Sequence, residues 1–337
     1  MNISWEEIEL YLRHTFVTAR ESKKNVKRVI VKLEDDGFYG LGEAAPSPRY
    51  SESVETVKNF LNEFNKLISE NMSLYTTLQM LNNLNGNYSA KSAVDIALYD
   101  LHTKKLNLPL WQYFGLTSDK IINTSFTIGI DTTENIERKL DEAHEFKVLK
   151  IKLGCEDDIK IIQTIRRYTD KPLRIDVNEG WKNLNKAIEL IKYLEDNNIE
   201  LIEQPLPSEM LYENNRLREQ TTIPIFADEN CKTFEDLILV KDYFDGINIK
   251  LSKCGGIFNA YLMIQVARYL NLKIMLGCMI ESSIGISAAA QLASMVDYID
   301  LDGNLLINND PYTGVICKEG ELKLINEPGI GVMKIEK

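Results

Sequence analysis

The segment LRIDVNEG, residues 173–180, joins a short apolar run to an acidic end. It is one of eight short β-rich segments in the chain. The other seven are SFTIGI (125–130), VLKIKLG (148–154), IELIEQP (199–205), IPIFADEN (223–230), GINIKLSK (246–253), KIMLGCM (273–279) and YIDLDGN (298–304). The residues at or near their ends recur every 24–27 positions: Thr127, Lys152, Asp176, Glu203, Asp228, Lys253, Cys278 and Asp302. Strands that alternate with amphipathic helices at a constant period favour a (β/α) barrel. An open doubly wound sheet also alternates in this way, but the chain carries no nucleotide-binding fingerprint to support it.

The rest of the chain predicts a second unit around this barrel. Residues 121–304 are few for a barrel of usually ~250 residues, so we expect compact helices and no full helix after the eighth strand. Residues 1–120 show strand patterns first, with a hairpin turn at Asp36–Gly37, and helix patterns after them. Residues 305–337 return to strand and turn patterns. The predicted fold is a modified TIM barrel, (β/α)₇β, with an N-terminal α+β capping domain completed by the C-terminal segment.

Composition excludes several classes of protein. The 337 residues are 44% hydrophobic and 26% charged, as in a soluble globular chain. A net charge of −11 opposes a phosphate backbone, so we expect no nucleic-acid partner. No apolar run approaches the roughly 18 residues of a membrane helix, so we expect no membrane partner. The five scattered cysteines indicate neither a disulfide framework nor a zinc site, and we expect a cytoplasmic protein.

Acidic residues end three successive predicted strands. Active sites of such barrels lie at the C-terminal ends of the strands, where Asp176, Glu203 and Asp228 would meet. An acid after a strand is often only the N-cap of the next helix. Three acids on neighbouring strands instead favour a hard divalent cation, which prefers oxygen ligands.

Lysines stand at the same end of the predicted barrel. Lys150 and Lys152 point the same way because side chains alternate along a strand. Burial and mutual repulsion can lower the pKa of such a lysine and make it a base. Lys253 lies on the sixth strand, across the barrel from the second, so that two bases could act on opposite sides of one carbon. For Lys250 we favour a structural role, as a buried partner of Asp228 or Glu229.

The ordered motifs resemble the muconate-lactonizing subgroup of the enolase superfamily over nearly the whole chain. They are SAVDIALYDLHTKKLNLPLWQYFG, KIK, DVNEGW, IEQP, ADEN, NIKLSKCGG and GCMIESS. The resemblance implies that Lys152 and Lys253 are the acid/base pair and that Lys150 contacts the substrate carboxylate. It also implies one Mg²⁺ per subunit, held by Asp176, Glu203 and Asp228.

The eighth strand points to one activity within the subgroup. Asp300-Leu-Asp302 is similar to the Asp-x-Asp of the dipeptide epimerases, which receives the α-ammonium of a dipeptide. The predicted function is Mg²⁺-dependent inversion of the α-carbon of the C-terminal residue by the two lysines, through an enediolate. Alternatives are an N-acylamino-acid racemase, a muconate- or succinylbenzoate-type cycloisomerase and a non-catalytic metal-binding barrel. Mandelate-type chemistry is disfavoured because no histidine lies beyond His144.

The choice of dipeptide stays open at this point. Thr127, Cys278 and Arg20 are expected to complete the substrate site, and we expect a homo-oligomer. Ala-Glu epimerases carry an arginine in the first loop, but counting from Phe16 places Glu21 at that position. Arg49 could replace it, or the preferred substrate side chain could be neutral or cationic.

Overall fold

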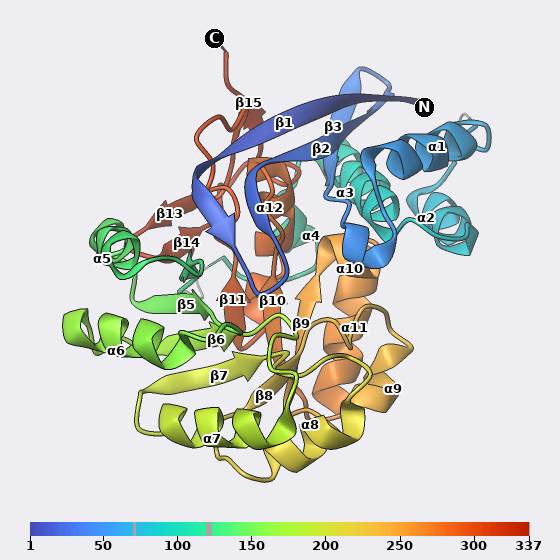
Figure 1. Ribbon diagram of the computed structural model, residues 1–337. Helices are drawn as coiled ribbons and strands as arrows, with labels where there is room; N and C mark the ends of the chain where they lie inside the picture. The colour runs from blue at the N-terminus through green and yellow to red at the C-terminus, as the bar shows by residue number, and fades with distance from the viewer. Residues whose placement is uncertain (70–71, 119–122, 337) are drawn as a thin grey trace.

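The N-terminal unit is an antiparallel sheet backed by helices (Figure 1). The computed structural model describes residues 1–69, 72–118 and 123–336. Its strands are β1 (Asn2–Val17), β2 (Ser22–Asp35) and β3 (Phe38–Ala44), paired in that order. Its helices are η1 (Pro48–Tyr50), α1 (Val54–Asn65), α2 (Leu74–Asn83), α3 (Tyr88–Lys105) and α4 (Leu110–Tyr113). The predicted hairpin turn is confirmed, because Asp36 and Gly37 both adopt a positive φ between β2 and β3.

The second unit is an eight-stranded parallel barrel. Its strands, in sheet order as well as chain order, are β4 (Ser125–Ile128), β5 (Val148–Lys152), β6 (Leu173–Asp176), β7 (Ile199–Glu203), β8 (Ile225–Ala227), β9 (Gly246–Lys250), β10 (Lys273–Gly277) and β11 (Tyr298–Asp300). A parallel bridge between Thr124 and Ile299 joins the first strand to the last and closes the barrel. The Thr124 hydroxyl strengthens this closure by accepting the Leu301 N–H at 2.8 Å.

Helices follow the first seven barrel strands, as predicted. They are α5 (Thr133–Glu142), α6 (Asp158–Tyr168), α7 (Leu184–Leu194), α8 (Leu211–Arg218), α9 (Asp236–Val240), α10 (Leu251–Cys254), α11 (Ile257–Tyr269) and α12 (Ser283–Ala290), with a 3₁₀ turn η2 (Ala293–Met295). They are short, and the described residues 301–336 contain no helix. The (β/α)₇β barrel with an α+β cap is therefore confirmed. No helix in the described part of the chain has the length and apolar character to cross a membrane.

The C-terminal segment contacts both units. Its strands are β12 (Tyr312–Thr313), β13 (Ile316–Lys318), β14 (Glu321–Lys323) and β15 (Met333–Lys334). Leu12 of the cap bridges Ile307, while the barrel residue Thr124 donates its N–H to Gly320 O at 2.8 Å. The predicted division of the chain after residues 120 and 304 stays a prediction, and its first boundary lies outside the described residues.

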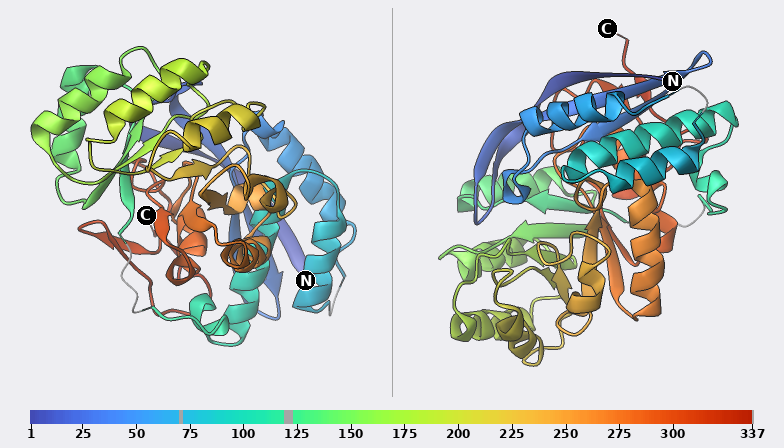
Figure 2. Two further views of the ribbon diagram at one scale, coloured as in Figure 1. Left: turned by 90° about the horizontal axis from the view of Figure 1, so that it is seen from below. Right: turned by 90° about the vertical axis from the view of Figure 1, so that its right-hand side faces the viewer.

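The cap lies across one end of the barrel (Figure 2). A buried carboxylate, that of Glu43, anchors it there. Glu43 at the end of β3 accepts the Ser282 N–H at 3.0 Å and the Ser282 hydroxyl at 2.6 Å. It also accepts the N–H of Gly285, in the first turn of α12, at 3.2 Å. A carboxylate at a helix N-terminus satisfies otherwise unpaired N–H groups. This contact holds the cap on the loop that follows β10.

Close packing of β3 against α3 gives the cap its core. A Cβ atom on Gly42 would lie 1.9 Å from Ala93 O, so only glycine allows this approach of strand to helix.

We expect Gly42→Ala to destabilise the protein by about 3 kcal/mol or more, because the clash is with backbone that cannot give way. Gly37→Ala is the matched control: its Cβ would meet nothing, and only its positive φ costs about 1 kcal/mol. Urea unfolding of both variants measures the difference, and equal losses would contradict the packing argument.

Candidate active site

Strand register brings the charged residues of the barrel to one rim. Lys152, Asp176 and Glu203 are the last residues of β5, β6 and β7, and they are paired across the sheet in that order. Asp228 directly follows β8. The four residues are buried. Because parallel strands end at the same edge, the predicted assembly of these side chains at the C-terminal rim is seen directly.

Lys150 occupies the centre of this acidic group. Its Nζ lies 2.9 Å from Asp176 Oδ2, 2.8 Å from Glu203 Oε2 and 2.6 Å from Asp300 Oδ2. The Lys152 Nζ lies 2.5 Å from the same Asp176 oxygen and donates to Asn178 Oδ1 at 3.1 Å. The two lysines of the KIK motif therefore point the same way, as the strand alternation predicts.

The electrostatics of the group differ from the expectation of lysines with lowered pKa values. Burial alone would lower the pKa of Lys150, but the charges of Asp176, Asp300 and Glu203 outweigh it and raise that pKa well above its ordinary value. The pKa of Lys250 is likewise raised, by Asp228 and Glu203 against the effect of burial. The prediction considered lysine–lysine repulsion and burial, whereas the carboxylates dominate here.

The three predicted acids have the donor set of a hard-cation site. All three are carboxylates on adjacent strands, and burial together with the Asp176 charge raises the pKa of Glu203 to about 7. Glu203 Oε2 is buried and accepts no hydrogen bond from the described residues, although the Lys150 ammonium lies 2.8 Å from it. In the described residues, no group of three or more His, Cys, Asp or Glu side chains is arranged to hold a metal ion. The residues fit a divalent cation by their chemistry, provided that the Lys150 ammonium moves from between Asp176 and Glu203.

The structure contradicts the placement of Lys253 in the site. Lys253 lies on α10, its side chain is 1% exposed, and it does not line the cavity at the barrel rim. Its ammonium has four oxygen acceptors: Asp228 Oδ1 (2.5 Å), Asp228 O (2.7 Å), Cys231 O (3.0 Å) and Asn248 O (3.0 Å). Lys253 is thus a buried support for the loop after β8.

Lys250 takes the place predicted for Lys253. It is the last residue of β9, it lines the cavity, and its Nζ lies 2.8 Å from Asp228 Oδ2. The predicted pairing with Asp228 is therefore present, and the same side chain also faces the cavity. A constant spacing of 25 pointed to residue 253, whereas β9 ends at residue 250. The signal that could have found Lys250 is the strand alternation in GINIKLSK. The strand ends at Lys250, because an extended strand cannot continue through the helical turn at 251–254.

The last strand and the loop that follows it supply two more acids to the same cavity. Asp300 accepts from the Ser125 hydroxyl at 2.6 Å as well as from Lys150. Asp302 accepts the N–H of Thr127 at 2.6 Å, and burial and the Asp300 charge raise the pKa of Asp302 to about 7. Cys278 donates its thiol to Asp300 O at 3.2 Å. Thr127, Cys278, Asp300 and Asp302 all line the cavity, as predicted for substrate-binding residues.

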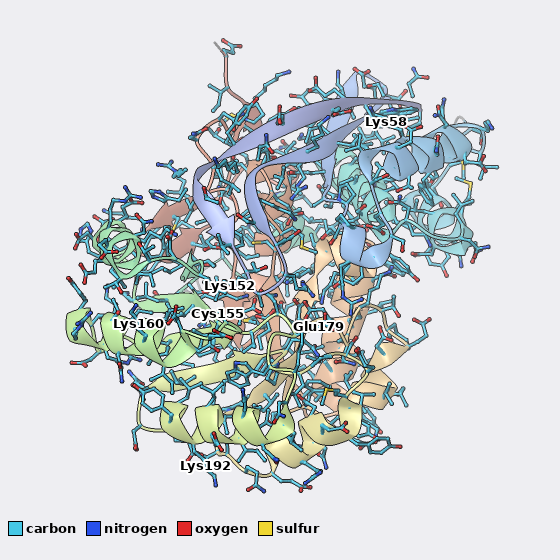
Figure 3. The ribbon with its side chains drawn as sticks, in the orientation of Figure 1. Lys58, Lys152, Cys155, Lys160, Glu179 and Lys192 are labelled. Atoms are coloured by element: carbon cyan, nitrogen blue, oxygen red, sulfur yellow. The ribbon has the colours of Figure 1, made fainter. Side chains whose placement is uncertain are left out.

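The cap forms the opposite wall of this cavity, whose empty volume is about 900 Å³ including its open mouth. Arg20 reaches the cavity, but its Nη1 lies 2.9 Å from Glu179 Oε2 and 2.6 Å from Glu229 Oε1. Arg49 also binds Glu179, with Nη2 2.9 Å from Oε1. Figure 3 shows Lys152 and Glu179 in the region between cap and barrel, whereas Lys58 and Lys192 lie on the outer parts of the molecule. Sequence reasoning missed Glu179 and Glu229 as partners of the cap arginines, because loops distant in the chain bring them together.

Comparison with known families places both units. Residues 131–335 match the family described as enolase C-terminal domain-like. Residues 7–115 match the N-terminal domain of mandelate racemase and muconate lactonizing enzymes.

Individual relatives match over nearly the whole chain. An L-Ala-D/L-Glu epimerase of Bacteroides thetaiotaomicron is 43% identical over 99% of this chain and 88% of its own. The substrate-liganded L-Ala-D/L-Glu epimerase of Bacillus subtilis superposes with a TM-score of 0.93 at 30% identity, covering 99% of this chain and 98% of that one. The dipeptide epimerase of Enterococcus faecalis, complexed with Mg and L-Leu-L-Tyr, has a TM-score of 0.91 at 32% identity and covers 98% of each chain.

The support role of Lys253 can be tested by its effect on stability. We expect Lys253→Met to lower the free energy of unfolding by about 3–5 kcal/mol, because the buried Asp228 carboxylate and three carbonyls lose their shared donor. Lys241→Met, at an exposed lysine paired with Asp242, should stay within about 0.5 kcal/mol of the parent. Urea unfolding measures both. A Lys253→Met protein as stable as the control would contradict the support role.

Proposed function

The chain belongs to the enolase superfamily, with the mandelate racemase/muconate lactonizing enzyme domains in order, and from this premise we propose that it is a Mg²⁺-dependent dipeptide epimerase. The observation that carries the proposal is the cavity itself. Lys152 and Lys250 both line it, acids lie between them along the rim, and Asp300 and Asp302 line it as well. The named relatives and neighbours, which are dipeptide epimerases, support the same activity.

Two lysines on opposite walls suit inversion of a carbon. β5 and β9 lie four strands apart in the eight-stranded barrel, so Lys152 and Lys250 approach the cavity from opposite sides. One neutral lysine removes the α-proton of the C-terminal residue, and the other, as an ammonium, returns a proton to the opposite face. The roles reverse for the other stereoisomer. We therefore propose the pair Lys152 and Lys250 in place of Lys152 and Lys253.

Asp176, Glu203 and Asp228 would hold the Mg²⁺ ion. When bound, Mg²⁺ supplies a positive charge that polarises the substrate carboxylate and makes its α-proton more acidic. The burial of Glu203 supports this assignment, since a buried carboxylate is costly unless a cation lies beside it, and the Lys150 ammonium now holds that position 2.8 Å from Oε2. A cation among the three acids also offsets the negative charge that raises the pKa values of Lys150 and Lys250. Lys150, released from its position between Asp176 and Glu203, would contact the substrate carboxylate.

Asp300 and Asp302 would receive the α-ammonium of the dipeptide. Both are buried, and the Ser125 hydroxyl and the Thr127 N–H orient them toward the cavity. A substrate ammonium between them would compensate their mutual repulsion. This pair disfavours an N-acylamino-acid racemase or a cycloisomerase, whose substrates bring no cation to this wall. A cytoplasmic location and a homo-oligomeric state stay predictions.

Replacement of either lysine tests the two-base mechanism. We expect Lys152→Ala and Lys250→Ala each to reduce epimerisation of L-Ala-L-Glu at least about 100-fold, because each removes one acid/base group. Each variant should still exchange the α-proton of one stereoisomer in deuterated water, and the two variants should choose opposite stereoisomers. Proton NMR measures the exchange. Exchange of the same isomer by both variants would contradict opposite faces.

The same assay separates the proposed function from its alternatives. The parent enzyme should exchange free-amine dipeptides. Exchange confined to N-acyl amino acids would identify a racemase instead, and no exchange with any substrate would leave a metal-binding barrel without catalysis. Lys253→Ala is a second control. Loss of a support residue should lower stability without changing which stereoisomer exchanges its α-proton.

Removal of one carboxylate tests the metal site. Loss of a residue that only hydrogen-bonds a metal ligand weakens metal binding about 10- to 100-fold. We expect Asp176→Asn and Glu203→Gln each to weaken Mg²⁺ binding by more than this, because each removes a ligand itself. Isothermal titration calorimetry with Mg²⁺ measures this without reference to turnover. Glu209→Gln, at an exposed acid of the loop after β7, should bind Mg²⁺ like the parent. Unchanged affinity in Asp176→Asn and Glu203→Gln would refute the site.

A further inference from the structure

The two oxygens of the Glu203 carboxylate have different partners. Oε1 accepts a hydrogen bond from the side-chain amide of Asn248, with Nδ2 at 2.7 Å. Oε2 lies 2.8 Å from the Lys150 ammonium. The Lys250 ammonium lies 3.8 Å from Oε1, beyond hydrogen-bond distance, and donates to Asp228 instead. One oxygen of this carboxylate is therefore held by a neutral donor, and the other lies beside a cation.

Asn248 is fully buried on β9, two residues before Lys250, and it does not line the cavity. The bond to Glu203 is the one hydrogen bond that its side chain makes within the described part of the chain, and its Oδ1 has no partner there. The amide lies against Gly277 of β10, where a Cβ atom would come within 2.5 Å of Oδ1 and 2.8 Å of Nδ2. The glycine thus makes room for an amide whose one polar contact is with Glu203.

The two partners of Glu203 respond differently to a metal ion among the acids. The Lys150 ammonium competes with the ion for the same negative charge, so it has to leave Oε2 before the ion binds. The Asn248 amide carries no net charge and approaches Oε1 from within the barrel wall, so its hydrogen bond can persist. Only Oε2 of this carboxylate is then free for the ion.

The number of oxygens that one carboxylate offers affects the choice of cation. Ca²⁺ takes six to eight oxygen ligands and accepts both oxygens of a single carboxylate. Mg²⁺ demands a near-octahedral set of ligands at shorter distances, and the two oxygens of one carboxylate lie too close together to fill two corners of an octahedron. A Glu203 that is limited to one oxygen therefore suits Mg²⁺ better than Ca²⁺.

We propose that Asn248 is a positioning residue that keeps Oε1 of Glu203 away from the metal, so that the site selects Mg²⁺ over Ca²⁺. The inference deepens the proposed function, because it rests on the metal site assigned to Asp176, Glu203 and Asp228. Asn248 acts through Glu203 and touches neither the metal nor the substrate. The alternative is that Asn248 only fills the interior of the barrel.

Calorimetric titration with Mg²⁺ alone and with Ca²⁺ alone separates these roles without reference to turnover. Asn248→Leu keeps a side chain of similar shape and removes the donor. Gly277→Ala keeps the donor but displaces the amide, and it serves if Asn248→Leu does not fold. Asn214→Leu is the matched control. Asn214 on α8 is also buried, its Nδ2 donates to Tyr243 O at 3.0 Å, and its Oδ1 has no partner in the described residues.

We expect Asn248→Leu to bind Mg²⁺ about 10- to 100-fold more weakly than the parent, the range for loss of a residue that hydrogen-bonds a metal ligand. Its Ca²⁺ affinity should stay within about threefold of the parent, because Ca²⁺ can use the released Oε1. Gly277→Ala should shift the ratio of the two Kd values in the same direction. Asn214→Leu should leave that ratio unchanged.

Equal losses of affinity for both cations in Asn248→Leu would make Asn248 a packing residue and overturn the proposal, as would an unchanged affinity for Mg²⁺. A parent that binds no Mg²⁺ would refute the metal site and this inference with it. A parent that binds Mg²⁺ but inverts no dipeptide, with the Kd ratio still shifted by Asn248→Leu, would refute the epimerase function and leave the role of Asn248 standing.

Discussion

The structure depends on a buried group of opposite charges at the C-terminal rim of the barrel. Carboxylates from β6, β7, β8 and β11 meet ammonium groups from β5 and β9 where water is largely excluded. Removing these charges from water costs several kcal/mol per ion, and only close pairing with complementary charges offsets that cost. Lys150, in contact with three acids at once, provides the densest pairing. Such a group sacrifices stability for a preorganised polar site, as expected where charge develops during a reaction.

Around this group, the cap acts as a part of the site. Glu43 holds β3 on Ser282, and Arg28 holds β2 on the Ile280 carbonyl, so two cap strands grip the one loop that carries Cys278 into the cavity. The arginine pairs to Glu179 and Glu229 add contacts from the cap loops. In the proposed function the barrel therefore carries the proton-transfer groups and the metal ligands, whereas the cap forms the opposite wall of the cavity. Substrate preference can change through the cap without disturbing the chemistry at the strand ends.

Two expectations from sequence failed for physical reasons that the structure makes plain. The constant period placed the second lysine at residue 253, but a strand ends where its hydrogen-bonding partners end, and β9 ends at Lys250 beside Gly277. Burial and repulsion between lysines predict a lowered pKa for Lys150, yet its ammonium lies within 2.9 Å of three carboxylates, whose charges raise that pKa. Both errors arise from reasoning along the chain about interactions that act across it.

The sequence by itself determined the barrel, its closure by eight strands, the α+β cap and the oxygen-rich group of Asp176, Glu203 and Asp228. These follow from local patterns, because strand length, helix period and the residue at a strand end are properties of short segments. Only the tertiary structure decided that Lys250 and not Lys253 reaches the cavity, and that Arg20 is paired with Glu179 and Glu229. Those outcomes depend on which loops pack together, and the energy of a buried charge is set by neighbours that lie up to hundreds of residues away in the chain.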